Sequence, residues 1–460
     1  MSIHSFHLLF IVLVTHTTSG YPNSSIPLEW SNICQSAINL SNVVISCHVG
    51  VDDTWDLDHF RNWSALLDND TLVSLDVMCE TGASACLPWP YRARHLDTLK
   101  IRNCINTCFF SNFHRREVLD IPDSLRVFEG YGVTEQFNVM DMLSVDLKSL
   151  PPALECGPMS LEVFIYRNTK ADIIYPKSFV PKGEDEVTNN FVQTARDINK
   201  LKHVCNYRNM KVYDASQRQD SSSAGIYATF INSRFPNLTT LNYSSTEIQA
   251  FPSILLSWKG RIEKLQILDL SHNNISRFDL RGGVQSFDAP IRVINLTYNS
   301  IQTIKEAEIG SFQSSVAQVV DVRQNPLRCD CAMADFSNFL RRHPTPEDAG
   351  LSLDYEYLWD LTCVDPVSKR GKQISQFSRK ALCNLDVVDV ASYQAFVAVL
   401  AVVVVILVAS LLLSILYREN VKLLISRSCR ILCGRSPINE QNINDGRHKD
   451  ESSKSTQEKL

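Results

Sequence analysis

Residues 265–275 read LQILDLSHNNI, and this stretch decides how the chain folds. The same order of apolar residues and asparagine returns in residues 291–301 and again in residues 317–327. The asparagines are Asn273, Asn299 and Asn325, so the intervals 299 − 273 and 325 − 299 are both 26 residues. A fixed period of this length predicts stacked turns of chain, because one turn cannot bury its apolar face alone.

Each position of the repeat has a physical reason. Alternating apolar residues such as Leu268 and Leu270 predict a short strand whose inward side chains form the core. The asparagine is expected where the chain turns, because its amide can satisfy backbone groups that would otherwise be buried unpaired. This is the leucine-rich-repeat pattern. It predicts an α/β solenoid, a leucine-rich-repeat horseshoe whose open ends need caps.

Weaker copies of the repeat come earlier in the chain. The apolar spacing is kept in residues 72–77, 96–101, 161–166 and 238–243, and Phe137, Met140 and Met142 are read as one more strand. No single register holds between residues 175 and 237. The prediction is roughly nine to eleven turns within residues 61–327. For the weak middle, amphipathic helices with chance leucines remain an alternative.

Both ends of the chain carry apolar segments. Residues 7–14 are apolar and are followed by small residues up to Gly20, which is typical of a secretory signal peptide over residues 1–20. Residues 395–416, AFVAVLAVVVVILVASLLLSIL, hold no charged residue. At ~1.5 Å per residue they span roughly 33 Å, enough to cross the hydrocarbon core of a bilayer.

Charge predicts which side of the membrane each end occupies. Basic residues follow the apolar segment at Arg418, Lys422, Arg427, Arg430 and Arg435. This excess predicts a cytosolic C-terminus. The chain is therefore expected to be a single-pass type I protein of the plasma membrane. A juxtamembrane stalk is predicted at residues 385–394, and a mostly disordered cytoplasmic tail at residues 417–460.

Glycosylation sequons support this orientation, because they all precede the apolar segment. The sequon asparagines are Asn23, Asn39, Asn62, Asn69, Asn237, Asn242, Asn274 and Asn295.

Of the 14 cysteines, all but Cys429 and Cys433 also precede the apolar segment. An even number in an oxidising compartment predicts disulfides rather than metal or thiol chemistry. Cys34 and Cys47 are candidates for a staple in an N-terminal cap region, residues 21–60. The juxtamembrane Cys429 and Cys433 are candidate palmitoylation sites. Other pairings stay open: Cys79, Cys86, Cys104 and Cys108 can pair within or between turns, and Cys156 and Cys205 are left to bridge the irregular middle.

The last repeat runs into the stretch QNPLRCDC, residues 324–331. The spacing of Cys329, Cys331, Cys363 and Cys383 resembles the C-terminal flanking domain of extracellular leucine-rich-repeat proteins. In that family the first cysteine pairs with the third and the second with the fourth. The resemblance therefore implies Cys329–Cys363 and Cys331–Cys383 in a C-terminal cap, residues 328–384, together with a short cap helix near Phe336.

The order of signal peptide, repeats, cysteine cap and single span resembles Toll-type receptors, and also the neuronal and adhesion leucine-rich-repeat membrane proteins. The segment after the span, residues 417–460, is too short for the cytoplasmic signalling domain of Toll-type receptors.

Solenoids of this kind usually bind partners on the strand face, through the exposed residue between the two inward ones. The candidate ligand face is Asp76, Lys100, Asp141, Asp269 and Asp321, in a column with Ile165, Asn242 and Asn295. Its aspartates could attract a basic partner. The alternative is an ordinary solvated face. Because Asn242 and Asn295 are sequons, their glycans are expected to direct large partners to a flank or to the N-terminal half.

No catalytic motif occurs in the sequence, so the protein is predicted to be a binder and not an enzyme, without cofactor or metal. A formal net charge of −5 gives no reason to expect nucleic acid. An enzyme hidden in residues 175–237 is the least favoured reading.

The expected function is a receptor-like protein that binds an extracellular protein or microbial ligand, as a co-receptor or decoy in innate recognition or signalling, alone or as a homo- or heterodimer. The alternative is a cell-adhesion protein with an anchoring tail.

Overall fold

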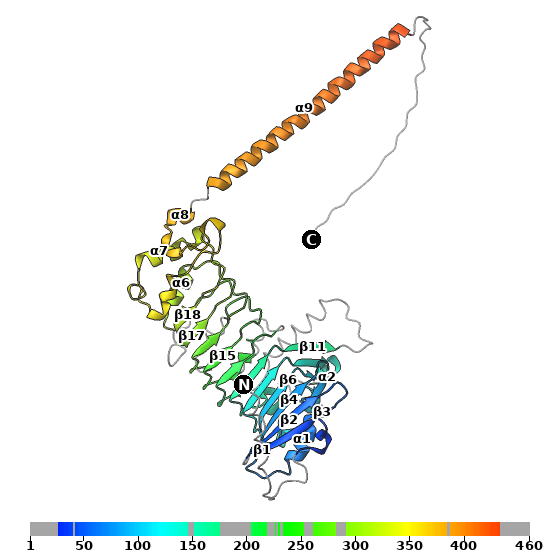
Figure 1. The fold of residues 1–460 in the computed structure, drawn as a ribbon, viewed down its shortest axis with the longest axis vertical. Coiled ribbons are helices and arrows are strands. Elements are labelled where there is room, and N and C mark those ends of the chain that lie inside the picture. The colour runs from blue at the N-terminus through cyan, green and yellow to red at the C-terminus, as the bar shows by residue number, and fades with distance from the viewer. Residues whose placement is uncertain are drawn as a thin grey trace, which may run out of the picture. The chain divides into compact units, whose positions relative to one another are not determined.

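The computed structural model describes residues 26–39, 42–145, 151–174, 204–218, 226, 229–230, 233–252, 261–281, 291–383 and 387–432. The predicted signal peptide, Asn23, Cys433 and the end of the tail lie outside the described residues. The chain divides into two compact units, Met1–Asn384 and Leu385–Leu460 (Figure 1).

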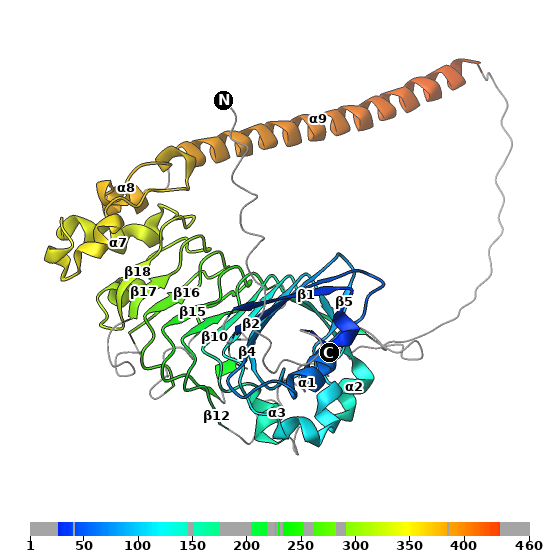
Figure 2. The ribbon, with the colours of Figure 1, turned by 60° about the horizontal axis from the view of Figure 1, so that its bottom comes forward.

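The first unit is built on an 11-stranded sheet. In sheet order its strands are β1 (Cys34–Asn39), β2 (Asn42–Val49), β4 (Leu72–Cys79), β6 (Leu96–Arg102), β8 (Val127–Tyr131), β10 (Val163–Arg167), β13 (Val212–Asp214), β15 (Thr240–Asn242), β16 (Ile267–Asp269), β17 (Ile291–Asn295) and β18 (Ala317–Asp321). Only β1 and β2 pair antiparallel; every later pair in this sheet is parallel. Figure 2 shows β15, β16, β17 and β18 as successive rungs of the stack.

A second sheet lies across the core from the first strands. In sheet order it consists of β11 (Lys170–Ile174), β9 (Thr134–Asn138), β7 (Ile105–Asn106), β5 (Ser84–Cys86) and β3 (Trp55–Asp56). A separate pair joins β12 (Cys205–Asn206) to β14 (Ser233–Arg234). The α-helices of the first unit are α1 (Leu57–Ser64), α2 (Val139–Ser144), α3 (Pro152–Cys156), α6 (Glu306–Phe312), α7 (Ala334–Arg342) and α8 (Arg379–Cys383). Short 3₁₀ helices are η1 (Leu28–Trp30), η2 (Ser111–His114), η3 (Arg116–Asp120), η5 (Cys331–Met333), η6 (Glu347–Ala349), η7 (Leu353–Leu358), η8 (Val367–Lys369) and η9 (Ile374–Gln376).

The repeat asparagines connect successive turns, as the sequence predicts. Asn299 Nδ2 donates to the carbonyl oxygens of Leu270 at 2.9 Å and Leu296 at 3.1 Å, and its Oδ1 accepts from the Ile275 amide at 2.9 Å. Asn325 repeats this pattern one turn later. These bonds satisfy backbone groups that the narrow coil buries. The chain is therefore a leucine-rich-repeat solenoid.

One strand assigned from the sequence is wrong in the middle of the solenoid. Phe137 lies in β9 of the second sheet, and Met140 and Met142 belong to helix α2. The rung of the main sheet is β8. β8 escapes the repeat pattern because Gly130 takes a place where a large apolar residue is expected. A Cβ atom on Gly130 would lie 2.4 Å from the Tyr166 ring, so this aromatic side chain fills the position from the next rung.

A regular rung also exists inside the region where no register holds in the sequence. β13 pairs parallel with β10 on one side and β15 on the other, and Met210 before it is buried. Residues 175–203 of this region lie outside the described residues. The stack is thus continuous from β2 to β18 in the main sheet.

Disulfides join neighbouring turns at the N-terminal end. Cys34–Cys47 closes the β1–β2 hairpin, and β2 already pairs in parallel with β4, so the stack begins inside the predicted cap region. The pairings that sequence left open are Cys79–Cys104, Cys86–Cys108 and Cys156–Cys205.

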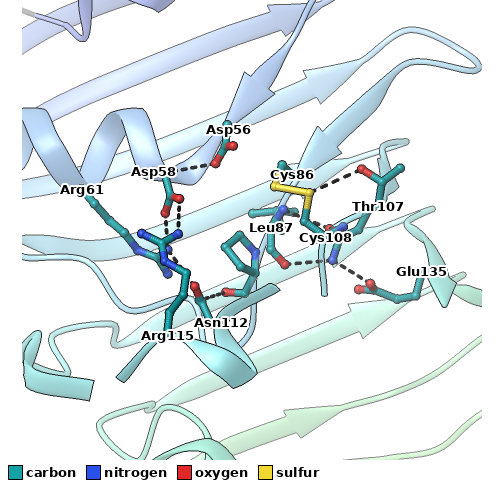
Figure 3. Close-up of a disulfide and its surroundings, with 12 residues drawn as sticks. Asp56, Asp58, Arg61, Cys86, Leu87, Thr107, Cys108, Asn112, Arg115 and Glu135 are labelled. Carbon is teal, nitrogen blue, oxygen red and sulfur yellow. Dashed lines mark hydrogen bonds and ion pairs between the residues drawn. A yellow bond between two sulfur atoms is a disulfide. The ribbon is translucent and has the colours of Figure 1, made fainter. Parts of the chain in front are cut away.

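Polar contacts surround the Cys86–Cys108 bond (Figure 3). Asp58 is paired with Arg61 on the same helix α1 and with Arg115, and the second pair joins α1 to the segment before η3. Asn106 binds the backbone of Leu87 through both amide atoms, at 3.0 Å each. Disulfides and side chains therefore hold these turns together where the asparagine repeat is absent.

The C-terminal cap covers the last rung. Its disulfides are Cys329–Cys363 and Cys331–Cys383, the two pairs that the family resemblance implies. Helix α7 buries Phe336 and Leu340, and the Phe336 ring lies 6.3 Å from that of Phe312 in α6. Apolar surface at the end of the solenoid is thereby removed from water.

The second unit contains one long helix, α9 (Val387–Leu432). Within it, Ala395–Arg418 is long and apolar enough to cross a membrane. The helix includes most of the predicted stalk and continues past the predicted span, so Cys429 lies on helical backbone.

Candidate ligand-binding face

The face of the 11-stranded sheet that points away from the core is named here the open face. Strand register places one residue per rung in a central column on this face. From β2 to β18 the column is Ser46, Asp76, Lys100, Glu129, Ile165, Asp214, Asn242, Asp269, Asn295 and Asp321.

Four of the five predicted ligand-face residues belong to this column, and Asp141 does not. Asp141 lies in helix α2, after β9, and Glu129 takes the place assigned to it. Asp214 also joins the column from the region where the sequence register is lost. Sequence reasoning missed Glu129 and Asp214 because their rungs lack the full apolar signature.

The charges of the column are largely paired within the chain. Asp76 is bound by Arg102, and Lys100 Nζ lies 3.1 Å from Glu129 Oε2. Arg167 Nη2 lies 2.6 Å from Asp214 Oδ2, and Arg323 binds Asp321. Burial raises the pKa of Asp214, but the hydrogen bonds from Arg167 and Ser216 outweigh it and hold that pKa below its usual value.

Among the residues that the structure describes, one central aspartate has no cationic partner. Asp269 accepts a hydrogen bond from the Ser271 amide at 2.9 Å, and no ion pair to it occurs among the residues that the structure describes. The column therefore presents much less unpaired negative charge than its sequence suggests. This weakens the expectation of a strongly basic partner.

A second column on the open face is uncharged and was not identified from the sequence. It lies two residues before the central one and consists of Val44, Ser74, Thr98, Val127, Val163, Val212, Thr240, Ile267, Val293 and Val319. Val44 is 41% exposed and Ile267 is 38% exposed, while Val127, Val163 and Val212 are half-buried. The signal was a β-branched residue two places before nearly every central residue, with Ser74 as the exception, because branched side chains favour strands.

Two sequons stand in the central column, on either side of Asp269. Asn242 Oδ1 accepts from the Ser244 amide at 2.9 Å, and its Nδ2 donates to Asp214 Oδ2 at 2.9 Å. Asn295 Oδ1 accepts from the Thr297 amide at 3.1 Å and hydroxyl at 2.8 Å. Both side chains are half-exposed on the open face.

A buried acid lies behind the N-terminal rungs. Glu135 on β9 is only 7% exposed and accepts hydrogen bonds from Asn106 Nδ2 at 2.7 Å and from the Tyr166 hydroxyl. Burial raises its pKa to about 7, against the two hydrogen bonds and Arg218, which lower it. The cluster joins β7, β9 and β10 through one ionisable group.

The core also holds a cavity of about 210 Å³ between the rungs of β10 and β13. Aromatic side chains form much of its wall, among them Trp89, Phe164 and Tyr207. The disulfide Cys156–Cys205 borders it. Among the described residues, no group of three or more His, Cys, Asp or Glu side chains could hold a metal ion.

Similarity to known proteins is partial. No family model matches the chain. Protein toll of Drosophila melanogaster is 31% identical over 170 residues, which are 35% of this chain and 15% of that protein. The chain thus spans about 15% of the length of the curated relative that it matches.

Two solved structures resemble the fold. Human trophoblast glycoprotein matches with a TM-score of 0.40 and 14% identity, over 78% of this chain and 98% of that one. A chain of the octameric complex of Latrophilin 3, Unc5D and FLRT2 matches with a TM-score of 0.41 and 9% identity, over 75% of this chain and 98% of that one. The assignment of the solenoid rests on the strand register and the asparagine bonds, not on these scores.

Proposed function

We propose that this chain is a receptor-like protein of the cell surface that binds an extracellular protein ligand through the open face. The observation that carries the proposal is the uncharged column of mostly β-branched residues beside a column whose charges are mostly paired. Such a surface can be desolvated at low cost, because its carboxylates keep their partners when water leaves. Interfaces between proteins combine apolar contact at the centre with satisfied polar groups around it.

The membrane attachment is part of this proposal. The helix segment Ala395–Arg418, the sequons before it and the basic residues after it support a type I orientation in the plasma membrane. Similarity to Protein toll over 170 residues supports a role in recognition, as a co-receptor or decoy. Binding without catalysis is the proposed activity.

The experiment displays the full chain on suspended cells. These cells are mixed with fluorescent cells of the same origin and, separately, with fluorescent microbial surface material. The test variant is Val163→Arg, at the centre of the uncharged column, because a desolvated cation there opposes an apolar contact. Surface amounts are matched by antibody staining against the wild type and against an exposed control, Gln302→Ala.

Saturable binding that Val163→Arg reduces at least about tenfold, or about 1.4 kcal/mol, is the expected result. Binding to sibling cells that persists when the chain after Ala395 is replaced by a lipid anchor favours the adhesion alternative. Binding only to microbial material favours recognition. Equal binding by wild type and Val163→Arg contradicts the open face as the contact site.

A further inference from the structure

The distribution of sequons divides the open face into two parts. Asn242, Asp269 and Asn295 are neighbours on β15, β16 and β17. Neighbouring strands are about 4.8 Å apart, so the two asparagines stand roughly 10 Å from each other. An N-linked glycan is bulky and hydrated. Two of them at this spacing cover the open face of these rungs.

The same turns carry two further sequons outside the column. Asn237 lies just before the β15 turn, and the exposed Asn274 follows the asparagine of the β16 turn. By contrast, the sequence from residue 70 to residue 236 contains no sequon. The earlier Asn62 lies on α1 and Asn69 in the loop after it, so neither is on a strand of the open face.

Five consecutive rungs without a sequon, β4, β6, β8, β10 and β13, are named here the window. Within the window, the last three residues of the uncharged column are Val127, Val163 and Val212. In the central column the apolar Ile165 stands between Glu129 and Asp214. An apolar centre is thus formed where β8, β10 and β13 lie side by side. This is the part of the open face where apolar side chains from both columns meet.

Charges frame the apolar centre and balance one another. In the central column of the window, each carboxylate, Asp76, Glu129 and Asp214, has a cationic partner. Those partners include Arg102 and Arg167, which share a third column with Tyr131. Arginine and tyrosine are enriched where proteins contact one another. A balanced frame does not favour a polyanion or a strongly basic chain.

We propose that glycans on Asn242 and Asn295 close the C-terminal part of the open face, and that the partner docks on the window. The partner is a folded protein whose contact surface has an apolar centre and charges of both signs at its rim. This inference rests on the proposed function, because it locates the contact site of the same ligand. It differs from that proposal in excluding β15 to β17.

The first experiment tests the shield without any partner. Full-length protein on cells is digested for mass spectrometry of the glycopeptides of Asn242 and Asn295. Val163→Cys in the window and Val293→Cys in the shield are then labelled with a small maleimide and with a large polyethylene-glycol maleimide. Both valines are half-buried in the same column, so their intrinsic accessibility is matched.

We expect glycans on both asparagines. The large maleimide should react several-fold more slowly with Val293→Cys than with Val163→Cys, whereas the small maleimide should react equally with both. Adding Asn242→Gln and Asn295→Gln should restore that rate. Unoccupied sites, or equal rates for both cysteines, overturn the shield. Cells that carry the wild-type protein are treated with the same two maleimides. Their labelling is the background, because the wild-type protein lacks the introduced cysteine.

The second experiment compares Val163→Arg with Val293→Arg in the cell-binding assay. Loss of binding with Val163→Arg alone supports the window. Loss with Val293→Arg alone overturns the window and leaves the proposed function standing. Saturable binding by neither wild type nor variants overturns the proposed function and this docking site together. Binding that survives protease treatment of the target cells but not glycosidase treatment identifies a carbohydrate ligand and overturns the protein partner.

Discussion

Individual side chains hold the turns of this solenoid together in two different ways. In the C-terminal turns Asn299 and Asn325 occupy the repeat position and satisfy buried backbone groups. In the N-terminal turns the repeat asparagine is missing, and Cys104 stands at the corresponding place, bonded to Cys79 of the previous turn. A buried polar cluster around Glu135 adds a contact that depends on protonation.

Glu135 predicts a pH-dependent stability. Its pKa is raised to about 7 in the folded chain, from 4.5. The stabilisation is therefore fully present below pH 4.5 and is lost as the pH rises through about 7. Glu135→Gln should flatten this dependence, which amounts to at most about 3 kcal/mol, because the amide stays neutral.

The measurement is the free energy of unfolding in urea, for wild type and Glu135→Gln, from pH 4.5 to above pH 7. Glu356 is exposed, so Glu356→Gln is the matched control. Its free energy of unfolding should depend on pH as that of the wild type does. Parallel curves for wild type and Glu135→Gln would show that Glu135 does not titrate in this range.

Among the elements, helix α7 has a task that no repeat performs. It covers the end of the stack after β18, with Phe336 and Leu340 on its buried side and Arg341 and Arg342 on its exposed side. Tyr355 and Tyr357 of η7 add to the cover, because the Tyr355 hydroxyl binds the Val320 amide at 3.1 Å. The cap thus satisfies the edge strand as well as the apolar core.

Phe336→Ala should destabilise the cap strongly. Phe336 is fully buried against Phe312, and such truncations cost about 3–5 kcal/mol. The expected outcome is a lower free energy of unfolding and faster proteolysis around β18. Arg341→Ala on the exposed side of the same helix should change stability by less than about 0.5 kcal/mol. Similar proteolysis of the two variants would argue against α7 as the cover of the last rung.

At the scale of the whole molecule, the solenoid unit and the helix unit have surfaces that suit different solvents. The solenoid encloses its apolar side chains, whereas α9 exposes Val, Leu and Ile on all sides between Ala395 and Arg418. A helix that is apolar all round is stable when lipid surrounds it. The sequons occur before this segment and the basic residues after it.

The orientation predicts where antibodies reach the full chain. An epitope tag after Leu460 should be stained only after the cells are permeabilised, and a glycosidase should shift the mass of protein on intact cells. The control variant, with all sequons before Ala395 changed from Asn to Gln, should lose the mass shift but keep the staining pattern. Staining of the C-terminal tag on intact cells would reverse the proposed topology.

The solenoid, its last three regular turns and the position of the apolar helix can all be predicted from the sequence alone. These features repeat at a fixed spacing or fill one uninterrupted segment, so each can be recognised from neighbouring residues. The pairing of Cys329 with Cys363 and of Cys331 with Cys383 followed from family resemblance and is the pairing in the structure.

Which residues share the open face in the irregular half depends on how the rungs stack, and the sequence does not show this. The Tyr166 ring on the β10 rung fills the space that a large side chain at position 130 would occupy. The β8 rung therefore lacks the full apolar pattern in its own sequence. For this reason Glu129 enters the central column and Asp141 leaves it. Asp214 enters it from the β13 rung, in the region where the sequence holds no single register. Local sequence cannot report the pairing of Asp76 with Arg102 or of Arg167 with Asp214, because each ion pair joins two rungs through their stacking.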